Sequence, residues 1–175
     1  MASILIAYST TDGHTLKICR VLQRVIEPHG HTVTLADIGA ADQLDLPAFD
    51  RIVIGASIRY GRHSPQVYDF IRRHRALLDE RPNAFFSVNI VARKPEKNRP
   101  DTNPYLRKFL RQIGWRPRQM AVFAGKLDYP RYRPVDRMMI RLIMLLTHGP
   151  TDPATVVEFT DWNSVEAFGH TLGRM

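Results

Sequence analysis

The feature that most constrains the fold is a regular alternation of short apolar runs with amphipathic stretches. Strands are expected in five apolar runs, at residues 4–8, 32–35, 52–56, 84–91 and 120–124. Helices are expected in the amphipathic stretches, at residues 16–26, 65–78, 105–113 and 161–171. Apolar strands separated by helices are typical of a parallel sheet that is buried on both faces. The pattern predicts an α/β fold, a doubly wound five-stranded parallel sheet, as a single domain over residues 1–175.

The turn after the first predicted strand is rich in hydroxyl groups and leads into a helix. It consists of Ser9, Thr10, Thr11, Asp12, Gly13, His14 and Thr15. Doubly wound sheets bind ligands beyond the carboxyl ends of their strands, where this turn lies. Free N–H groups and the helix dipole favour a phosphate at a helix N-terminus, and nearby hydroxyls add donors. The turn has neither a Walker motif nor a dinucleotide fingerprint. It predicts a phosphate site, and ordinary helix capping is the alternative.

This turn, from Tyr8 to Thr15, resembles the phosphate loop of the flavodoxin family. The resemblance implies a flavodoxin-like fold and FMN as the cofactor, with residues 9–15 around its phosphate and no added cation. Asp12 departs from the Thr or Gly that the family usually has at this position. A carboxylate beside a phosphate is unfavourable unless its side chain points away from it.

Two later turns are expected to surround the flavin ring if the resemblance holds. Ser57, Tyr60 and Gly61 follow the third predicted strand, and Tyr60 is the expected aromatic plate against the ring. A tyrosine that packs on the sheet edge is the alternative. Asn89, at the end of the fourth predicted strand, and the peptides of Ala92 and Arg93 are expected at the polar edge of the flavin. A cation at residue 93 would also favour a reduced, anionic flavin.

Longer stretches narrow the resemblance to one branch of the flavodoxin-like proteins. Similarity to the menaquinone-dependent protoporphyrinogen oxidases of bacterial haem synthesis extends over essentially the whole chain, notably residues 54–61, 87–97, 115–117, 127–133 and 160–162. The resemblance implies oxidation of protoporphyrinogen IX to protoporphyrin IX, with electrons passed to a membrane quinone, menaquinone or ubiquinone. A flavodoxin-fold NAD(P)H:quinone reductase and an electron-transfer flavodoxin are the alternatives.

The positive charge of the chain is concentrated in one segment. The whole chain has 25 Lys and Arg against 17 Asp and Glu, a formal net charge of +8. Residues 93–141 alone have 14 basic and four acidic side chains, a local excess of +10. Such a segment is expected to contact an anionic partner. Nucleic acid is not expected, because the segment has no obvious reading helix or series of stacking aromatic residues.

An insert at about residues 126–153 interrupts the alternation of strands and helices. In it, the run 138–146 has eight apolar residues in nine and follows Arg131, Arg133 and Arg137. Apolar residues with flanking cations are typical of a segment that lies on an anionic membrane surface. Guanidinium groups also match the carboxylates of a substrate that carries propionates. The insert is therefore predicted to contact the membrane, the substrate or both, and a core helix packed on the sheet is the alternative.

Several absences narrow the expected class of protein. No apolar stretch has the length of a membrane-spanning helix, and the N-terminus does not resemble a signal peptide. We therefore expect a peripheral protein on the cytoplasmic side of the cell membrane. The single cysteine, Cys19, excludes a disulfide framework, and the seven histidines show no metal-ligand or hydrolytic spacing, so no metal is expected. The sequence identifies no proton acceptor and leaves the oligomeric state open.

Overall fold

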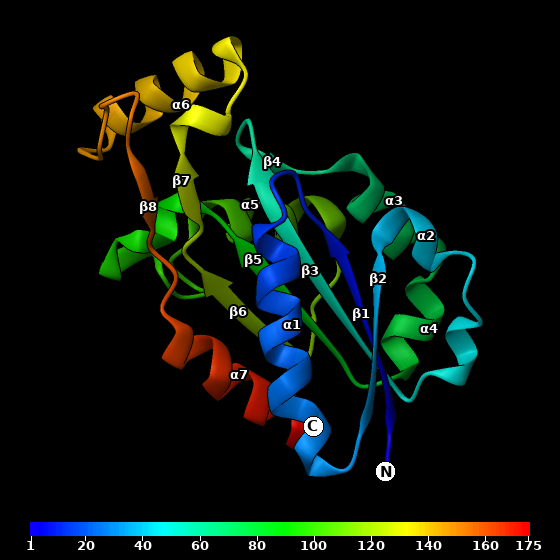
Figure 1. Cartoon of the computed structure of the whole chain (residues 1–175). Helices are drawn as coiled ribbons and strands as arrows, with labels where there is room; N and C mark the ends of the chain where they lie inside the picture. The colour runs from blue at the N-terminus through cyan, green and yellow to red at the C-terminus, as the bar shows by residue number, and fades with distance from the viewer.

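A five-stranded parallel sheet forms the centre of the molecule (Figure 1). The structure is a computed structural model that describes residues 1–175. The strands lie in the order β2-β1-β3-β5-β6, with bounds Ser3–Ser9 for β1, Thr32–Asp37 for β2, Arg51–Arg59 for β3, Asn83–Val88 for β5 and Gln119–Phe123 for β6. A short strand, β4 (Arg62–His63), pairs antiparallel with β3. The predicted α/β fold with five parallel strands is confirmed.

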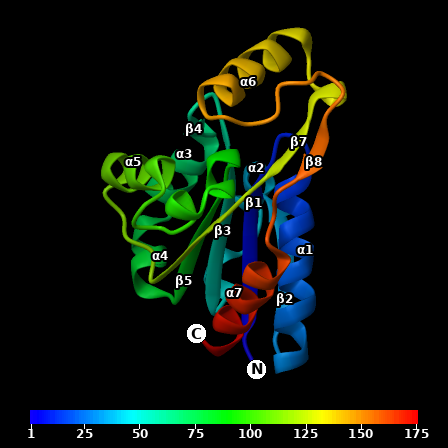
Figure 2. The same cartoon turned by 90° about the vertical axis from the view of Figure 1, so that its left-hand side faces the viewer.

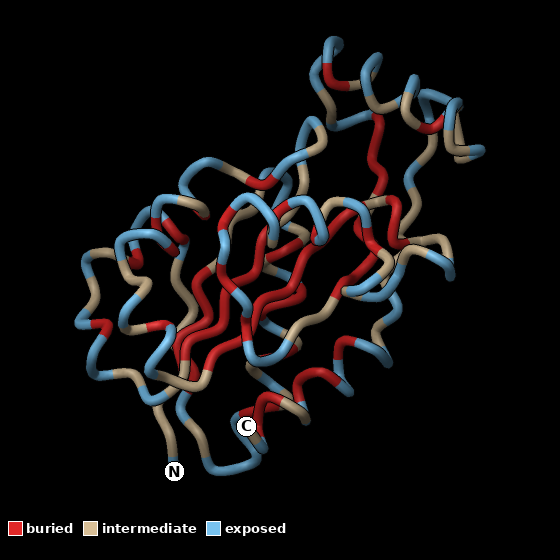
Figure 3. The backbone as a smooth tube through the Cα atoms, turned by 180° about the vertical axis from the view of Figure 1, so that it is seen from behind, coloured by how far each residue is buried: buried red, intermediate tan, exposed pale blue.

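Helices cover both faces of the sheet. One face carries α1 (His14–Ile26) and α7 (Trp162–Arg174), which pack against each other over a cluster of 15 buried residues. The other face carries α2, α3, α4 and α5, with bounds Ile38–Ala41, Pro65–Arg73, Arg75–Glu80 and Pro104–Ile113, over a cluster of 20 buried residues. Figure 3 shows the buried backbone running along the strands between these layers. The strand order reverses at β1, because β2 lies on one side of it and β3 on the other.

Two predicted elements are shorter than their apolar patterns indicated. The helix expected at 65–78 is divided at His74, whose backbone leaves the helical region (φ −106°, ψ 19°), so that α3 and α4 are separate. The strand expected at 84–91 ends at Val88, because the side chain of Asn89 accepts a hydrogen bond from the Ala92 N–H. That bond turns residues 90–93 into a short 3₁₀ helix. Apolar composition alone does not reveal either turn.

The insert forms a separate unit beyond the carboxyl ends of the strands (Figures 1 and 2). Its stem is an antiparallel pair, β7 (Lys126–Asp128) and β8 (Val156–Glu158), and its outer part is helix α6 (Pro134–Leu146). Only Leu127, Tyr129 and Met144 form its buried cluster. The alternative of a core helix packed on the sheet is therefore wrong. No helix in the structure combines the length and the apolar character needed to cross a membrane.

Candidate functional site

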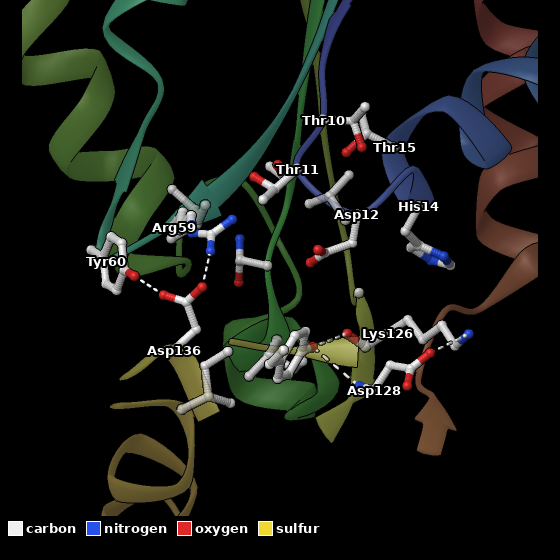
Figure 4. Close-up of a pocket in the computed structure, with 18 of the residues that line it drawn as sticks. Thr10, Thr11, Asp12, His14, Thr15, Arg59, Tyr60, Lys126, Asp128 and Asp136 are labelled. Carbon is white, nitrogen blue, oxygen red and sulfur yellow. Dashed lines mark hydrogen bonds and ion pairs between the residues drawn. The ribbon is translucent and has the colours of Figure 1, made fainter. Parts of the chain in front are cut away.

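One cavity of about 620 Å³ lies where the strand order reverses, between the carboxyl ends of the strands and the insert (Figure 4). The sheet side contributes three segments, residues 10–15, 57–61 and 88–91. The insert closes the opposite side with residues from β7, α6 and β8. The structure thus brings together most of the residues predicted from the three turns, although they are up to 81 positions apart in the chain (from Thr10 to Val91).

The turn that precedes α1 has unused hydrogen-bonding capacity. Gly13 is the N-cap residue, has a left-handed backbone (φ 82°, ψ −3°) and leaves open space where a Cβ would lie. The Thr10 hydroxyl accepts a hydrogen bond from the Gly13 N–H at 3.0 Å. The Thr15 hydroxyl is buried and has no partner, although buried polar atoms are nearly always hydrogen-bonded. An open backbone, free N–H groups and an unpaired hydroxyl fit the phosphate of a flavin mononucleotide better than they fit ordinary capping.

Asp12 lies on the rim of this turn, and its carboxylate extends toward the insert, away from the hydroxyls of Thr10 and Thr15 (Figure 4). With this orientation, the Asp12 carboxylate would not lie beside a phosphate bound at these hydroxyls, so the two negative charges would not be in contact. The charge of Asp12 instead affects Tyr132 of the insert. Burial raises the pKa of the Tyr132 hydroxyl above its usual value, and the negative charge of Asp12 raises it further.

A cluster around Glu158 joins the return strand of the insert to α1. Glu158 accepts hydrogen bonds from the Lys17 ammonium at 2.8 Å and from the Trp162 indole N–H at 2.7 Å. Burial opposes ionisation of this carboxyl, but these two hydrogen bonds hold its pKa below the usual value. His14 shares a 2.6 Å hydrogen bond with the Thr160 hydroxyl, and burial lowers the pKa of its imidazole. The side chain of His14 is thus used within the protein, and its backbone is what the turn can offer to a ligand.

Tyr60 lies on the turn between β3 and β4, in a conformation unusual for a side-chain-bearing residue (φ 50°). Gly61, which follows, also has a positive φ of 75°. Tyr60 is 55 % exposed as a residue and lines the cavity, so it is not packed against the sheet edge. Its hydroxyl donates to the Asp136 carboxylate of α6, which also pairs with Arg59 (Figure 4). Ser57 lines the same wall.

Asn89 lies at the floor of the cavity within a buried polar network. Its amide N–H₂ donates to the Ser87 hydroxyl at 3.2 Å, and its amide oxygen accepts from Asn103 and from the Ala92 N–H, each at 3.1 Å. Ser87 also contacts the imidazole of His63 at 2.9 Å, and burial lowers the pKa of His63 to about 3. The Asn89 amide and the Ala92 N–H therefore hold the turn at 89–93 in place, and Asn89, Ile90 and Val91 line the cavity.

The structure separates other predicted residues from the cavity. Arg93 donates to the Ile90 carbonyl at 3.1 Å and to the Thr147 carbonyl at 2.9 Å, so that its guanidinium anchors the end of α6. Neither Arg93, nor Ala92, nor Ser9 belongs to the cavity lining. The Arg93 guanidinium, which was expected at the polar edge of the flavin ring, thus binds backbone carbonyls instead.

The three arginines that were expected to act together have different surroundings. Arg131 is exposed, lines the cavity and forms no ion pair in the structure. Arg133 is exposed at the N-cap of α6 and lies outside the lining. The guanidinium of Arg137 donates to the Tyr129 carbonyl at 3.1 Å, which ties α6 to the turn before it.

Helix α6 has two apolar sides, which adjoin along the helix. Its inner side, which lines the cavity, carries Asp136, Met139, Ile140 and Ile143. Its outer side has large exposed side chains at Val135, Met138, Leu142, Leu145 and Leu146, each at least half exposed. Exposed apolar patches of this kind mark contacts with another protein, a ligand or a membrane.

Comparisons with known proteins agree with this geometry. A family model described as a flavodoxin domain matches residues 5–154. The protoporphyrinogen IX dehydrogenase (quinone) of Escherichia coli strain K12 is 44 % identical over 171 residues, covering 98 % of this chain and 94 % of the relative. The protein of the same name from Leishmania major is 42 % identical over 165 residues, covering 94 % of this chain and 71 % of the relative. This chain belongs to the protoporphyrinogen IX dehydrogenase (quinone) family.

Solved structures support the flavodoxin fold. The rubredoxin oxygen:oxidoreductase of Desulfovibrio gigas has a TM-score of 0.54 and 14 % identity, with 98 % of this chain aligned to 35 % of that one. A flavodoxin from the domain Archaea has a TM-score of 0.50 and 14 % identity, covering 98 % of this chain and 96 % of that one. Identities this low concern the fold alone.

Several residues of the cavity were not predicted from the sequence of this family member. They are the members of three ion pairs: Arg59 with Asp136, Lys17 with Glu158, and Lys126 with Asp128. Arg59 directly precedes Tyr60, in a turn that was already expected at the site, so the sequence could have indicated that Arg59 lines the cavity. The acidic partners Asp136 and Glu158 are 77 and 141 residues away from their cations, and no local pattern connects them.

Proposed function

We propose that this protein oxidises protoporphyrinogen IX to protoporphyrin IX and passes the electrons to a membrane quinone. The observation that carries the proposal is the 44 % identity to a protein of that activity, which extends over 98 % of the chain and so includes the insert as well as the flavodoxin core. The cavity between these two parts supplies a site of suitable character, with polar groups at one end and apolar side chains of α6 at the other.

The cofactor that the flavodoxin domain implies is FMN. Thr10, Thr11 and Thr15, with the N–H groups at the start of α1, are proposed to hold its phosphate. Residues 57–61 and 88–91 are proposed to flank its ring. When bound, the flavin supplies the hydride-accepting chemistry that no side chain can provide, and the protein contributes positioning and electrostatics.

The insert is proposed to hold the porphyrinogen. A macrocycle with propionate groups needs an apolar surface and a cation, and the inner side of α6 offers Met139, Ile140 and Ile143 close to Arg131. Arg131 is the suitable cation because it lines the cavity without an acidic partner. A guanidinium group can bind a carboxylate through two parallel hydrogen bonds.

The outer side of α6 is proposed to lie on an anionic membrane, on its cytoplasmic side. Its exposed apolar side chains suit the boundary between headgroups and acyl chains, and Arg133 lies at the start of the same helix. A poorly soluble porphyrinogen and a lipid-dissolved quinone would both reach the site from the bilayer.

The test is to record the absorption spectrum of the purified protein and then mix it anaerobically with protoporphyrinogen IX. Forming the porphyrin removes six electrons and each flavin accepts two, so the protein is used in at least threefold molar excess over the porphyrinogen. We expect a flavin spectrum that bleaches on mixing while the porphyrin Soret band rises, and that returns when a quinone is added. Mixing with NADH or NADPH is the matched experiment for the reductase alternative. A protein that is bleached by a nicotinamide and not by the porphyrinogen would reject the proposal, and so would a protein that binds no flavin.

A further inference from the structure

Asp136 connects the insert to the turn that carries Tyr60. It lies in the first turn of α6 and is only 5 % exposed. One carboxylate oxygen accepts a hydrogen bond from the Tyr60 hydroxyl, and the other accepts one from the Arg59 guanidinium. Figure 4 shows these three side chains meeting at the cavity wall, from α6 on one side and the end of β3 on the other. All three line the cavity.

The burial of Asp136 makes this contact difficult to break. A buried carboxylate is strongly unfavourable unless it is paired and hydrogen-bonded. Only Arg59 and Tyr60 pair with or donate a hydrogen bond to the Asp136 carboxylate, and they are 77 and 76 residues away from it in the chain. If α6 moved away from the turn, Asp136 would need water to replace both partners.

The side chain of Tyr60 gives a second reason to look for a constraint at this turn. The positive φ of Tyr60 and of Gly61 belongs to the two-residue turn that joins the paired strands β3 and β4, so the hairpin sets the backbone there but does not fix the direction of the ring. The ring is more than half exposed, so packing does not hold it. The hydroxyl bond to Asp136 and the guanidinium of Arg59, whose centre lies 5.5 Å from the ring centroid, are the contacts available for this purpose.

We propose that Asp136 is a positioning residue, which fixes the Tyr60 ring and the Arg59 guanidinium at the cavity wall and thereby couples the insert to the cofactor site. The inference rests on the proposed function in that Tyr60 is taken to face the flavin ring. It adds that the aromatic wall depends on α6 and not on the flavodoxin core alone. A displacement of α6, for example on contact with a membrane, is then transmitted to the ring pocket.

The test is a double-mutant cycle of Asp136→Asn and Tyr60→Phe, with the dissociation constant of FMN measured by flavin fluorescence. Asp136→Asn keeps the shape of the side chain and removes its charge, and Tyr60→Phe removes only the hydroxyl. We expect Asp136→Asn to weaken FMN binding about tenfold in the wild-type protein and only about twofold in the Tyr60→Phe background. Asp136→Glu, which restores a carboxylate, is expected to recover part of the affinity.

Asp128→Asn is the matched control for this cycle. Asp128 is also a largely buried carboxylate of the insert, lines the same cavity and forms an ion pair with Lys126 at 3.1 Å, but it does not contact Tyr60. Its effect on FMN binding is expected to be the same in the wild-type and Tyr60→Phe backgrounds. The visible flavin spectrum, which reports the surroundings of the ring, should shift in Asp136→Asn more than in Asp128→Asn.

Hydrogen exchange gives a readout that does not need the flavin. Asp136→Asn is expected to accelerate exchange at residues 57–61 as well as in the first turns of α6, whereas Asp128→Asn should affect only residues near β7. If Asp136→Asn does not fold, Tyr60→Phe alone should still accelerate exchange at residues 134–140. Unchanged exchange at 57–61 in Asp136→Asn, or independent effects in the cycle, would overturn the proposal. Coupled exchange in a protein that binds no FMN would support the contact and reject the flavin function instead.

Discussion

The two ends of the cavity are held in place by different kinds of contact. At the end proposed to bind the phosphate, the turn 10–15 is shaped by its own backbone and by near neighbours, such as the Thr10 hydroxyl, which accepts a hydrogen bond from the Gly13 N–H three residues away. At the insert end, α6 is held by distant polar partners, Asp136 on Arg59 and Thr147 on Arg93, over a buried cluster of only three residues. The first end is therefore shaped by local contacts, whereas the position of the insert depends on a few polar contacts between distant residues.

The largest effect is expected at the end formed by the turn 10–15. Replacing Thr10, Thr11 and Thr15 together by alanine removes up to three hydroxyl donors to a charged phosphate, each contributing roughly 1.5–3 kcal/mol. FMN affinity, measured by fluorescence titration, is expected to fall by more than about a hundredfold. Thr171→Ala, in α7, is the control, since its hydroxyl is bonded to the Ala167 carbonyl away from the site. Wild-type affinity in the triple variant would refute the phosphate site.

Tyr60→Ala should have the next largest effect, because it removes both an aromatic contact with the ring and the hydroxyl that reaches Asp136. An aromatic pair contributes about 0.5–1.5 kcal/mol beyond its buried area, so FMN binding is expected to weaken about tenfold or more. The visible flavin bands should shift, and flavin fluorescence should be less quenched. If the affinity and the spectrum are both unchanged, Tyr60 does not face the flavin.

Arg131→Gln tests whether the insert end of the cavity binds the substrate carboxylates. With a water-soluble electron acceptor, KM for protoporphyrinogen is expected to rise about tenfold, since a hydrogen bond to a charged group contributes about 1.5 kcal/mol or more. FMN content should be retained. Arg133→Gln is the matched control, because Arg133 is two residues away and outside the cavity lining. Equal KM values for the two variants would remove Arg131 from the substrate site.

The same two variants, Arg131→Gln and Arg133→Gln, distinguish membrane binding from substrate binding. Arg133→Gln is expected to weaken co-sedimentation with anionic vesicles about fivefold, because a cation near an anionic surface contributes about 1 kcal/mol. Changing Leu142 and Leu145 to serine as well should remove the part of the binding that persists at high salt, since apolar contacts are not screened. Vesicle binding that is insensitive to all three substitutions would place the membrane contact elsewhere or exclude it.

The smallest effect concerns the cluster that joins β8 to α1. Because the pKa of Glu158 is lowered in the folded protein, its charge stabilises the fold above the unfolded-state pKa of about 4.3. This stabilisation is lost as the pH falls through the lower folded-state value. Glu158→Gln is therefore expected to lower the thermal midpoint by about 2 °C or less at pH 6, and by less still at pH 3. An equal difference at both pH values would show that the charge is not responsible.

The sequence was sufficient for the sheet and for most helices, because these depend on short-range patterns. Short apolar runs between amphipathic stretches predict buried strands. The turn 10–15 lies at the cavity as expected, and the anion site that Gly13 and its neighbouring hydroxyls predict there stays a prediction. The division at His74 and the early end of the fourth strand at Val88 were missed, because backbone turns within apolar stretches leave the hydrophobic pattern unchanged.

Only the tertiary structure decided how the insert meets the cavity. Met138 and Ile140 are both apolar, and the sequence does not tell which of them faces the site and which faces outward. The sequence likewise could not direct Arg93 to Thr147 or join Asp136 to Tyr60, because these partners are 54 and 76 residues apart. Local periodicity indicates the buried side of a helix that has one apolar side, but α6 has two, and polar contacts between residues far apart in the chain depend on how distant elements are brought together in space.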